Sequence, residues 1–530
     1  MITTTRHWRR GLAVALLCLA AVPASADPRP DPPGARAIDA PIQLRAVRFV
    51  GHTRLSDDEL QAIAAPFLGR PLRALDLEEL RQRVTRAYVE RGYVSSGAQF
   101  DDDALRDGTL TLRVVEGVIG RVRQTGLGRL SPDYLSVRLA DPDEPLHLGR
   151  LQERFQLQLA DPLFERLNAR LLPDQVPGRS LLDIEVTRAR PWQVALFAHN
   201  QGAPAVGSDI WGVDGSVRNL SGWGDRLALT LQRSGGSTGG ELGWTIPVAA
   251  SRTLAQLRVS RQRSSVVEEP LNDLDIASVV SSREATLSHP FVDEARQRWA
   301  AGLTHALRHN RTRLGGEPFS FVAGESTGTT RIETWRLFLE GTQRLGPAVV
   351  ATRLTRGQGR NNVQPDPELP RVPAARYGLW QLQAQAQLPL ADDALQLLLR
   401  AQAQRSRQAL VPMEQMAIGG RQTVRGWREN SRVRDNAQAF SIELHWPLRR
   451  AEGGIGPTLT LVPFVDAGTA WNVGEAQQHL SSAGLGIQVS WSGIDAELFV
   501  GHPLNTRDPA SRGNAQDHGI HFLLRWRPQP

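Results

Sequence analysis

The chain of 530 residues lacks lysine and contains a single cysteine, Cys18. Its 62 basic side chains are therefore all arginines. One cysteine excludes an internal disulfide framework and a thiolate metal site. Beyond residue 26 there is no run of about 18 apolar residues, which excludes membrane-spanning helices. A β-barrel remains open, because its alternating faces average to the hydropathy of a soluble protein.

Residues 1–26 have the order of features expected of a secretory signal peptide. Three arginines precede an apolar run from Gly11 to Val22, and small residues lead up to Ala26, as in an exported precursor. Removal of this segment would leave 59 arginines against 55 acidic side chains, a net charge of +4, and no cysteine. So small a charge argues against a nucleic-acid partner.

A proline-rich linker is expected over residues 27–42, followed by a first small α/β domain over 43–117. In this domain Ser56 to Glu59 form a capping box that starts a helix, and a second helix is predicted from Asp76 to Arg91. Two strands should follow. The two strands are expected over residues 94–100 and 109–116, and the acidic residues Asp101 to Asp103 are expected in the turn between them.

A second domain of the same β-α-α-β-β pattern is expected over residues 118–190. Ser131 and Pro132 are suited to the cap and first turn of a helix, and a further helix is predicted over 148–159. The strands of this domain are predicted over 121–125, 164–172 and 181–187.

Beyond Arg190 the periodicity changes from helical to strict alternation. A representative segment places apolar Phe440, Ile442, Leu444 and Trp446 opposite polar Ser441, Glu443 and His445. A period of two with one apolar and one polar face indicates β-strands. The last segment, ending at Trp526, shows the same pattern.

About sixteen such segments occur between Trp192 and the C-terminus, an even number suited to a bacterial outer-membrane barrel. Long and short connections mostly alternate, and the longest covers residues 405–435. A soluble β-sandwich would explain the alternation but neither the strand number nor the loop asymmetry. The expected strands are 192–200, 211–218, 225–233, 240–247, 253–262, 282–288, 297–308, 330–342, 347–355, 376–387, 395–404, 436–446, 457–466, 483–491, 494–501 and 518–526.

Several motifs resemble the outer-membrane transporters of two-partner secretion, called TpsB proteins or the haemolysin secretion and activation family. The segments from Val47 to Thr53, Tyr88 to Tyr93 and Gly108 to Gly117 resemble a POTRA domain of that family. A loop motif resembles its VRGY-type sequence and a later strand resembles its partner motif. The loop residues are Gly419, Gly420, Val424, Arg425, Gly426 and Trp427, and the strand residues are Phe464, Asp466 and Gly468.

The resemblance implies a mixed fold, with two periplasmic POTRA domains (43–117 and 118–190) before a transmembrane antiparallel barrel (191–530) in the outer membrane of a Gram-negative bacterium. Loop 405–435 is expected to fold into the lumen. Arg425 offers a forked donor, and Asp466 on a lumen-facing strand offers a carboxylate that could accept two bonds. Trp427 stands where the family motif has tyrosine. The short proline-rich segment before the first POTRA domain argues against a plug helix.

The implied function is transport of an exported protein, a TpsA-type adhesin or cytolysin, to the cell surface. The POTRA sheet edges and helices (43–190) would bind this substrate, by strand addition to a sheet edge. The membrane lipid and the barrel-assembly machinery would be further partners, the latter for the chain's own insertion. No cofactor, metal site or catalytic cluster is expected.

Three other functions remain as alternatives. An assembly factor of the BamA or TamA type shares the superfamily, although such factors usually carry more than two POTRA domains. A passive pore would need no POTRA domains, and an enzyme would need a catalytic cluster that no motif here supplies. His305 and His309 share one strand face but have no third ligand nearby, so a lumen-facing or girdle position is favoured.

Overall fold

The computed structural model describes residues 41–528, except 142, 249–251, 367, 370, 391–394, 452–455 and 506–512. The predicted signal peptide and nearly all of the predicted linker lie outside this part of the chain. The protein divides into two compact units at Ala189–Arg190, each described by itself below. Among the described residues, no helix has the length and apolar character needed to cross a membrane.

The N-terminal unit begins with an α/β fold whose sheet has the order β2-β5-β4, with β2 parallel and β4 antiparallel to β5. Helices α1 and α2 pack on this sheet through Leu60, Leu80 and Tyr88, which are all buried. The predicted capping box at Ser56 and Glu59 is present. The elements are β1 (Ile42–Gln43), β2 (Ala46–Val50), α1 (Asp57–Ala64), η1 (Ala65–Phe67), β3 (Pro71–Leu72), α2 (Ala74–Glu90), β4 (Gly97–Arg106) and β5 (Thr109–Val115).

The acidic residues Asp101 to Asp103 do not form the expected turn. They lie within β4, where the register against β5 shifts between Phe100 and Leu105. Asp101 forms hydrogen bonds with the guanidinium group of Arg113 on β5. The irregular register lets three consecutive acidic residues remain in a strand, which alternation alone does not predict.

A second α/β fold repeats this arrangement with sheet order β6-β8-β7. The predicted helix over 148–159 is confirmed, whereas the prediction that Ser131 caps the preceding helix is wrong. Pro132 occupies the N-cap position, and no side chain caps the helix. The elements are β6 (Val118–Thr125), α3 (Asp133–Leu139), α4 (Leu148–Leu159), β7 (Phe164–Pro173) and β8 (Arg179–Arg188).

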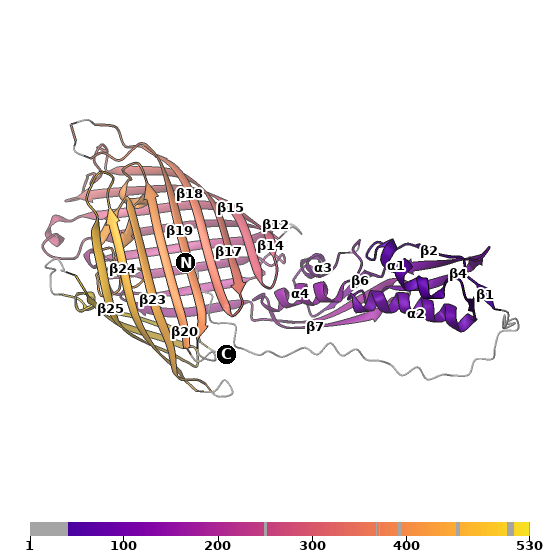
Figure 1. Ribbon diagram of the computed structural model, residues 1–530. Helices are drawn as coiled ribbons and strands as arrows, with labels where there is room; N and C mark the ends of the chain where they lie inside the picture. Colours follow the sequence, from indigo (N-terminus) through magenta and orange to yellow (C-terminus); the bar gives the residue numbers. More distant parts are fainter. Residues whose placement is uncertain are drawn as a thin grey trace. The chain divides into compact units, whose positions relative to one another are not determined.

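The C-terminal unit is a closed antiparallel barrel (Figure 1). Pairing of β27 with β9 closes it. Within the described residues it contains sixteen long strands, and the short β16 (Glu317–Pro318) adds to the end of β15. The long strands are β9 (Trp192–His199), β10 (Ile210–Arg218), β11 (Arg226–Arg233), β12 (Ser237–Val248), β13 (Thr253–Ser265), β14 (Ala277–Asp293), β15 (Gln297–Leu314), β17 (Thr329–Leu345), β18 (Ala348–Asn361), β19 (Arg376–Leu390), β20 (Leu395–Ser406), β23 (Asn436–Arg449), β24 (Thr458–Trp471), β25 (Gln478–Trp491), β26 (Ile494–Pro503) and β27 (Ile520–Trp526).

Alternation along each strand separates an apolar outer face from a polar inner face. On β23 the side chains of Phe440 and Ile442 are exposed, while Ser441 and Glu443 between them are buried. On β24 Val465 is exposed and Asp466 is buried. The outer face therefore suits lipid, and the inner face presents hydrogen-bonding groups to the lumen.

Several strands extend well beyond the predicted spans. β14 begins at Ala277 rather than residue 282, and β15 ends at Leu314 rather than residue 308. The β15 extension is polar on both faces as far as Arg313, and the β14 extension carries Val279 and Val280 on opposite faces, so both lack the alternation by which a strand is recognised. They are held by the backbone ladder, which continues to the pair Ala277 and Arg313.

Candidate functional site in the barrel lumen

The connection between β20 and β23 folds into the barrel and occupies its lumen. It contains a short helix, η4 (Pro412–Glu414), and a two-stranded ribbon of β21 (Met416–Ile418) and β22 (Arg432–Arg434). Its residues contact inward-facing side chains on both sides of the barrel, from β15 and β17 to β24 and β27. We call residues 407–435 the lumen loop.

Arg425, near the tip of the lumen loop, is fully buried and bound to Asp466 on β24. Its Nε and Nη2 donate to the two carboxylate oxygens of Asp466, each at 2.7 Å. The backbone N–H of Arg425 donates to the same carboxylate at 3.0 Å. A two-pronged, fully desolvated contact of this kind fixes the position of the loop as well as its charge.

A second acid completes the environment of Arg425. Glu443 on β23 accepts from Nη1 at 2.7 Å, and Ser441 accepts from Nη2 at 2.8 Å. The guanidinium carbon also lies 3.7 Å from the ring centre of Phe464. Glu443 in turn binds Arg400 on β20, so two arginines and two acids share the site. Because the buried charges balance, removal of one partner leaves another uncompensated.

Gly426 turns the loop tip against the neighbouring strands β26 and β27. Its φ is +85°, and a Cβ at this position would lie 2.8 Å from the carbonyl carbon of Gly501 on β26. Its N–H donates to Nε2 of His521 on β27 at 3.2 Å. The next residue, Trp427, is buried and donates its indole N–H to the carbonyl oxygen of Ser481. The tip thus contacts strands on both sides of Asp466.

The remaining motif residues bring the loop close to the wall. Gly468 lies two residues beyond Asp466 on β24 and therefore on the same face of the strand. A Cβ on Gly468 would approach Cγ2 of Val424 to 2.9 Å. Gly420 has φ of +93°, and its missing side chain leaves room for the carboxylate of Glu429. Gly419, with φ of +104°, similarly allows the backbone oxygen of Arg428 to approach.

The base of the lumen loop is anchored separately from its tip. The side chain of Glu414 is fully buried and accepts from Arg308 on β15 at 3.0 Å and from Arg336 on β17 at 2.8 Å. Asp435, also buried, accepts from the N–H of Leu410 and from Arg371. Arg425 and Glu414 therefore fasten the loop to different parts of the wall.

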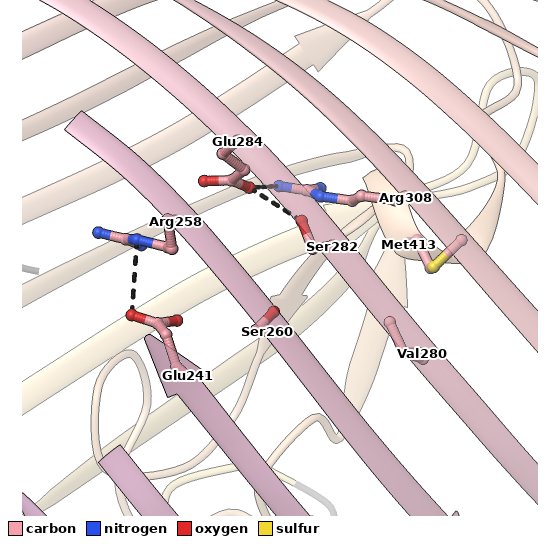
Figure 2. Close-up of a pocket in the computed structure, with 8 residues that line it drawn as sticks. All are labelled: Glu241, Arg258, Ser260, Val280, Ser282, Glu284, Arg308 and Met413. Carbon is pink, nitrogen blue, oxygen red and sulfur yellow. Dashed lines mark hydrogen bonds and ion pairs between the residues drawn. The ribbon is translucent and has the colours of Figure 1, made fainter. Parts of the chain in front are cut away.

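A cavity of about 290 Å³ remains beside the base of the loop, against β12 to β15 (Figure 2). Arg258 faces Glu241 at 3.5 Å, and Arg308 joins Glu284 at 3.0 Å. Figure 2 shows these pairs along adjacent strands with Met413 of the loop at one side. Since Arg308 also binds Glu414, one side chain connects the cavity wall with the loop.

The structure brings together Arg425, Asp466, Val424 and Gly468, all singled out in the sequence. Sequence reasoning missed Glu443 and His521 as contacts of the loop tip. Glu443 could have been found, because it falls on the polar face of an alternating strand. His521 carries no comparable signal, since its approach depends on barrel closure between β27 and β9.

The described residues contain no group of three or more histidine, cysteine, aspartate or glutamate side chains arranged to hold a metal ion. His305 and His309 face outward with the exposed Leu303 and Leu307 of β15. The ring of His305 lies 4.4 Å from that of Trp335 on β17. This places His305 in the outer wall beside an aromatic residue.

Comparison with solved structures supports the architecture. A structure of CdiB from Escherichia coli aligns over 94% of this chain and 92% of its own, with a TM-score of 0.70 and 19% sequence identity. At that identity the likeness concerns the fold: two small α/β domains followed by a barrel.

Sequence comparison gives related proteins of the same kind. The outer membrane transporter CdiB of Dickeya dadantii is 21% identical over 485 residues, which cover 87% of this chain and 83% of that protein. The heme/hemopexin transporter protein HuxB of Haemophilus influenzae is 26% identical over 180 residues, 33% of this chain and 32% of that protein.

Two family models match the chain. The model of the ShlB-type POTRA domain matches residues 42–117. The model described as haemolysin secretion/activation protein ShlB/FhaC/HecB matches residues 178–489, more than half of the chain. With its POTRA domains, its closed barrel and this match, the chain belongs to the haemolysin secretion/activation family of outer-membrane transporters.

Proposed function

We propose that this chain is the outer-membrane transporter of a two-partner secretion pair, and that it carries one exported polypeptide from the periplasm to the cell surface. The observation that supports this most strongly is the lumen loop, seated by Arg425 on Asp466 and by Glu414 on the opposite wall. A barrel with such a removable occupant suits controlled passage better than a permanently open pore.

The partner would be a TpsA-type exoprotein, met in the periplasm by the POTRA domains (residues 43–190). Each POTRA sheet leaves two edge strands, β2 and β4 in the first and β6 and β7 in the second. An unfolded chain could add to such an edge by backbone hydrogen bonds, a mode that needs little sequence specificity. The membrane lipid and the barrel-assembly machinery are the other expected partners.

The loop contacts are proposed to act as a lock. In the seated state the guanidinium group of Arg425 is satisfied by two carboxylates. Passage of a polypeptide requires the loop to leave this position, so buried charges must become hydrated or find new partners. The transporter would therefore have two discrete states, because intermediate positions of the loop would leave a buried charge unpaired at a high cost in free energy.

Secretion tests the proposal directly. The chain would be deleted in its host, and release of each exported protein encoded beside its gene would be assayed in the medium. Loss of one such protein from the medium, with unchanged levels of other outer-membrane barrels, is the expected result. Depletion of many barrels without a secretion defect would instead identify an assembly factor.

A further inference from the structure

One side of the barrel carries a group of outward-facing arginines at the end of its strands. On β13 the outward side chains Leu257 and Val259 are followed, at the same alternation, by Arg261 and Arg263. The same change from apolar to arginine occurs on the adjacent strands. We call the six exposed side chains Arg261, Arg263, Arg283, Arg311, Arg313 and Arg331 the arginine belt.

The register makes these residues neighbours. Arg261 on β13 pairs with Ser281 on β14, Ser281 with His309 on β15, and His309 with Arg331 on β17. The next outward row joins Arg263 to Arg311 through Val279. Adjacent strands lie about 4.8 Å apart, so the first row spans roughly 14 Å.

These arginines differ from those on the inner face in having no acidic partner. Inside the barrel Arg258 pairs with Glu241, Arg308 with Glu284 and Arg353 with Glu340. None of the six guanidinium groups of the arginine belt forms an ion pair with any residue that the structure describes. The six positive charges of the arginine belt are thus available to bind an anion from outside the chain.

The belt lies at the cell-surface end of the barrel. β9 begins at Trp192, four residues after the last POTRA strand ends at Arg188, so its first residue is at the periplasmic end. Counting strands alternately from β9, β13 and β15 end outside and β14 begins outside. At the corresponding ends of β25, β26, β27, β9 and β10, the described residues include no arginine. These strands separate the two ends of an arginine-bearing part of the outer rim, which also includes the exposed Arg233 of β11, Arg360 of β18 and Arg376 of β19.

We propose that the arginine belt binds the phosphate groups of a phosphorylated glycolipid in the outer leaflet, the lipid A part of lipopolysaccharide. The guanidinium fork matches phosphate oxygens and can bind them with two parallel bonds. The exposed apolar side chains further along the strands from the belt, Leu257 on β13 and Leu287 on β14 among them, lie where acyl chains of the same molecule would run. Free phosphate would contact only the arginines of this surface and none of its apolar side chains. The site is independent of whether the chain secretes a protein.

Binding to the purified full-length protein in detergent tests the proposal. The probes are bisphosphorylated lipid A, dephosphorylated lipid A with the same acyl chains, and inorganic phosphate. The triple variant Arg261→Gln, Arg311→Gln, Arg331→Gln should bind bisphosphorylated lipid A about tenfold more weakly than the native chain. The matched control replaces three exposed arginines of the POTRA domains, Arg48→Gln, Arg86→Gln and Arg170→Gln, and should bind normally.

Three results would overturn the proposal: equal affinity of the triple variant and the control, equal binding of the two forms of lipid A, or displacement of the lipid by equimolar inorganic phosphate. If the glutamine variant does not assemble, the lysine variant at the same three positions replaces it. Lysine keeps the positive charge, so this variant should still prefer the phosphorylated lipid. A lysine variant without that preference would also contradict the proposal.

Discussion

At the scale of single residues, the buried arginine of the lumen loop carries the largest expected effect. Replacement of Arg425 by alanine leaves Asp466 and Glu443 buried without their shared cation, which costs about 3–5 kcal/mol for a pair of this type. The loop should leave its seat while the barrel, closed by its own ladder, remains assembled. We expect secretion to fall to less than about a tenth of the native level.

The measurement for this prediction combines release of the partner into the medium with heat-modifiable migration of the barrel on gels. Arg407→Ala is the control, because this exposed arginine lies at the start of the same loop. Normal secretion by Arg425→Ala would contradict the role given to the pair.

Gly426 permits a second residue-scale test that separates close packing from backbone conformation. Gly426 and Gly474 both have positive φ, +85° and +82°, but only Gly426 faces atoms that a Cβ would touch. Gly426→Ala should destabilise the seated loop by about 2–3 kcal/mol, from strain and from contact with Gly501, whereas Gly474→Ala should show strain alone. Protease sensitivity of the loop in the assembled barrel measures the difference. Equal sensitivity of the two variants would show that contact with β26 does not hold the tip.

The sequence could predict the central pair of the site but not its full surroundings. Arg425 and Asp466 stand out because each belongs to a compact motif. Glu443 and His521 are brought to the same place by strand register and barrel closure, which depend on residues far apart in the chain. A pattern confined to one segment carries no information about such neighbours.

At the scale of elements, the lumen loop is held by two anchors that should act differently. Glu414 joins Arg308 and Arg336, and its loss would free the loop base while Arg425 still holds the tip. Glu414→Gln should weaken this anchor by about 3 kcal/mol and make open-channel events in planar bilayers more frequent. Glu340→Gln is the matched control, because it breaks a pair with Arg353 between two wall strands. Identical channel records for the two variants would argue against a separate base anchor.

The first POTRA domain depends on an acid at the end of β5. Glu116 accepts from the backbone N–H groups of Thr53 and Arg54 and from the hydroxyl of Tyr88. Burial tends to raise the pKa of Glu116, but these hydrogen bonds outweigh it and hold the pKa below its usual value. The unfolded group has the higher pKa, so the stabilisation is present above about pH 4.3 and is lost as the pH falls through the lower, folded value.

Glu116→Gln should therefore lower the stability of this domain by about 1–3 kcal/mol at neutral pH and remove part of its acid sensitivity. Hydrogen exchange of β2 and β5 in the full chain, followed from pH 7 to pH 3, measures both effects. Glu90→Gln, an exposed change at the end of α2, is the control. An unchanged pH profile in Glu116→Gln would contradict the assignment.

Strand positions were predictable to a greater degree than strand lengths. All sixteen expected segments coincide with long strands, because each crosses a region with one apolar face. The ends of β14 and β15 escape the pattern, since Val279 and Val280 on β14 lie on opposite faces and the end of β15 is polar on both faces as far as Arg313. Backbone pairing between β14 and β15 continues at these ends, although the side chains there no longer alternate between apolar and polar.

At the scale of the whole molecule, a mean hydropathy of −0.31 conceals two opposite surfaces. The barrel exposes leucine, valine and tryptophan outward, while arginine, glutamate and glutamine line its interior. The absence of lysine makes every inner cation a guanidinium group, which can bind two acids at once, as Arg308 and Arg425 do. The side chains that line the lumen thus form a network of shared ion pairs to which the loop binds.

We propose that the lumen loop leaves its binding position whenever a polypeptide passes. Gly468 and Val424 are close enough for a disulfide between cysteines at these positions, because a Cβ on Gly468 would lie 2.9 Å from Cγ2 of Val424. After removal of the predicted signal peptide no native cysteine would compete. The variant Val424→Cys, Gly468→Cys would fasten the loop to β24 under oxidising conditions.

The decisive measurement is secretion of the partner by this double variant before and after addition of a reductant to the same cells. We expect the oxidised transporter to release none and reduction to restore release, while a native transporter responds to neither condition. Equal secretion by the fully cross-linked and the reduced forms would contradict it.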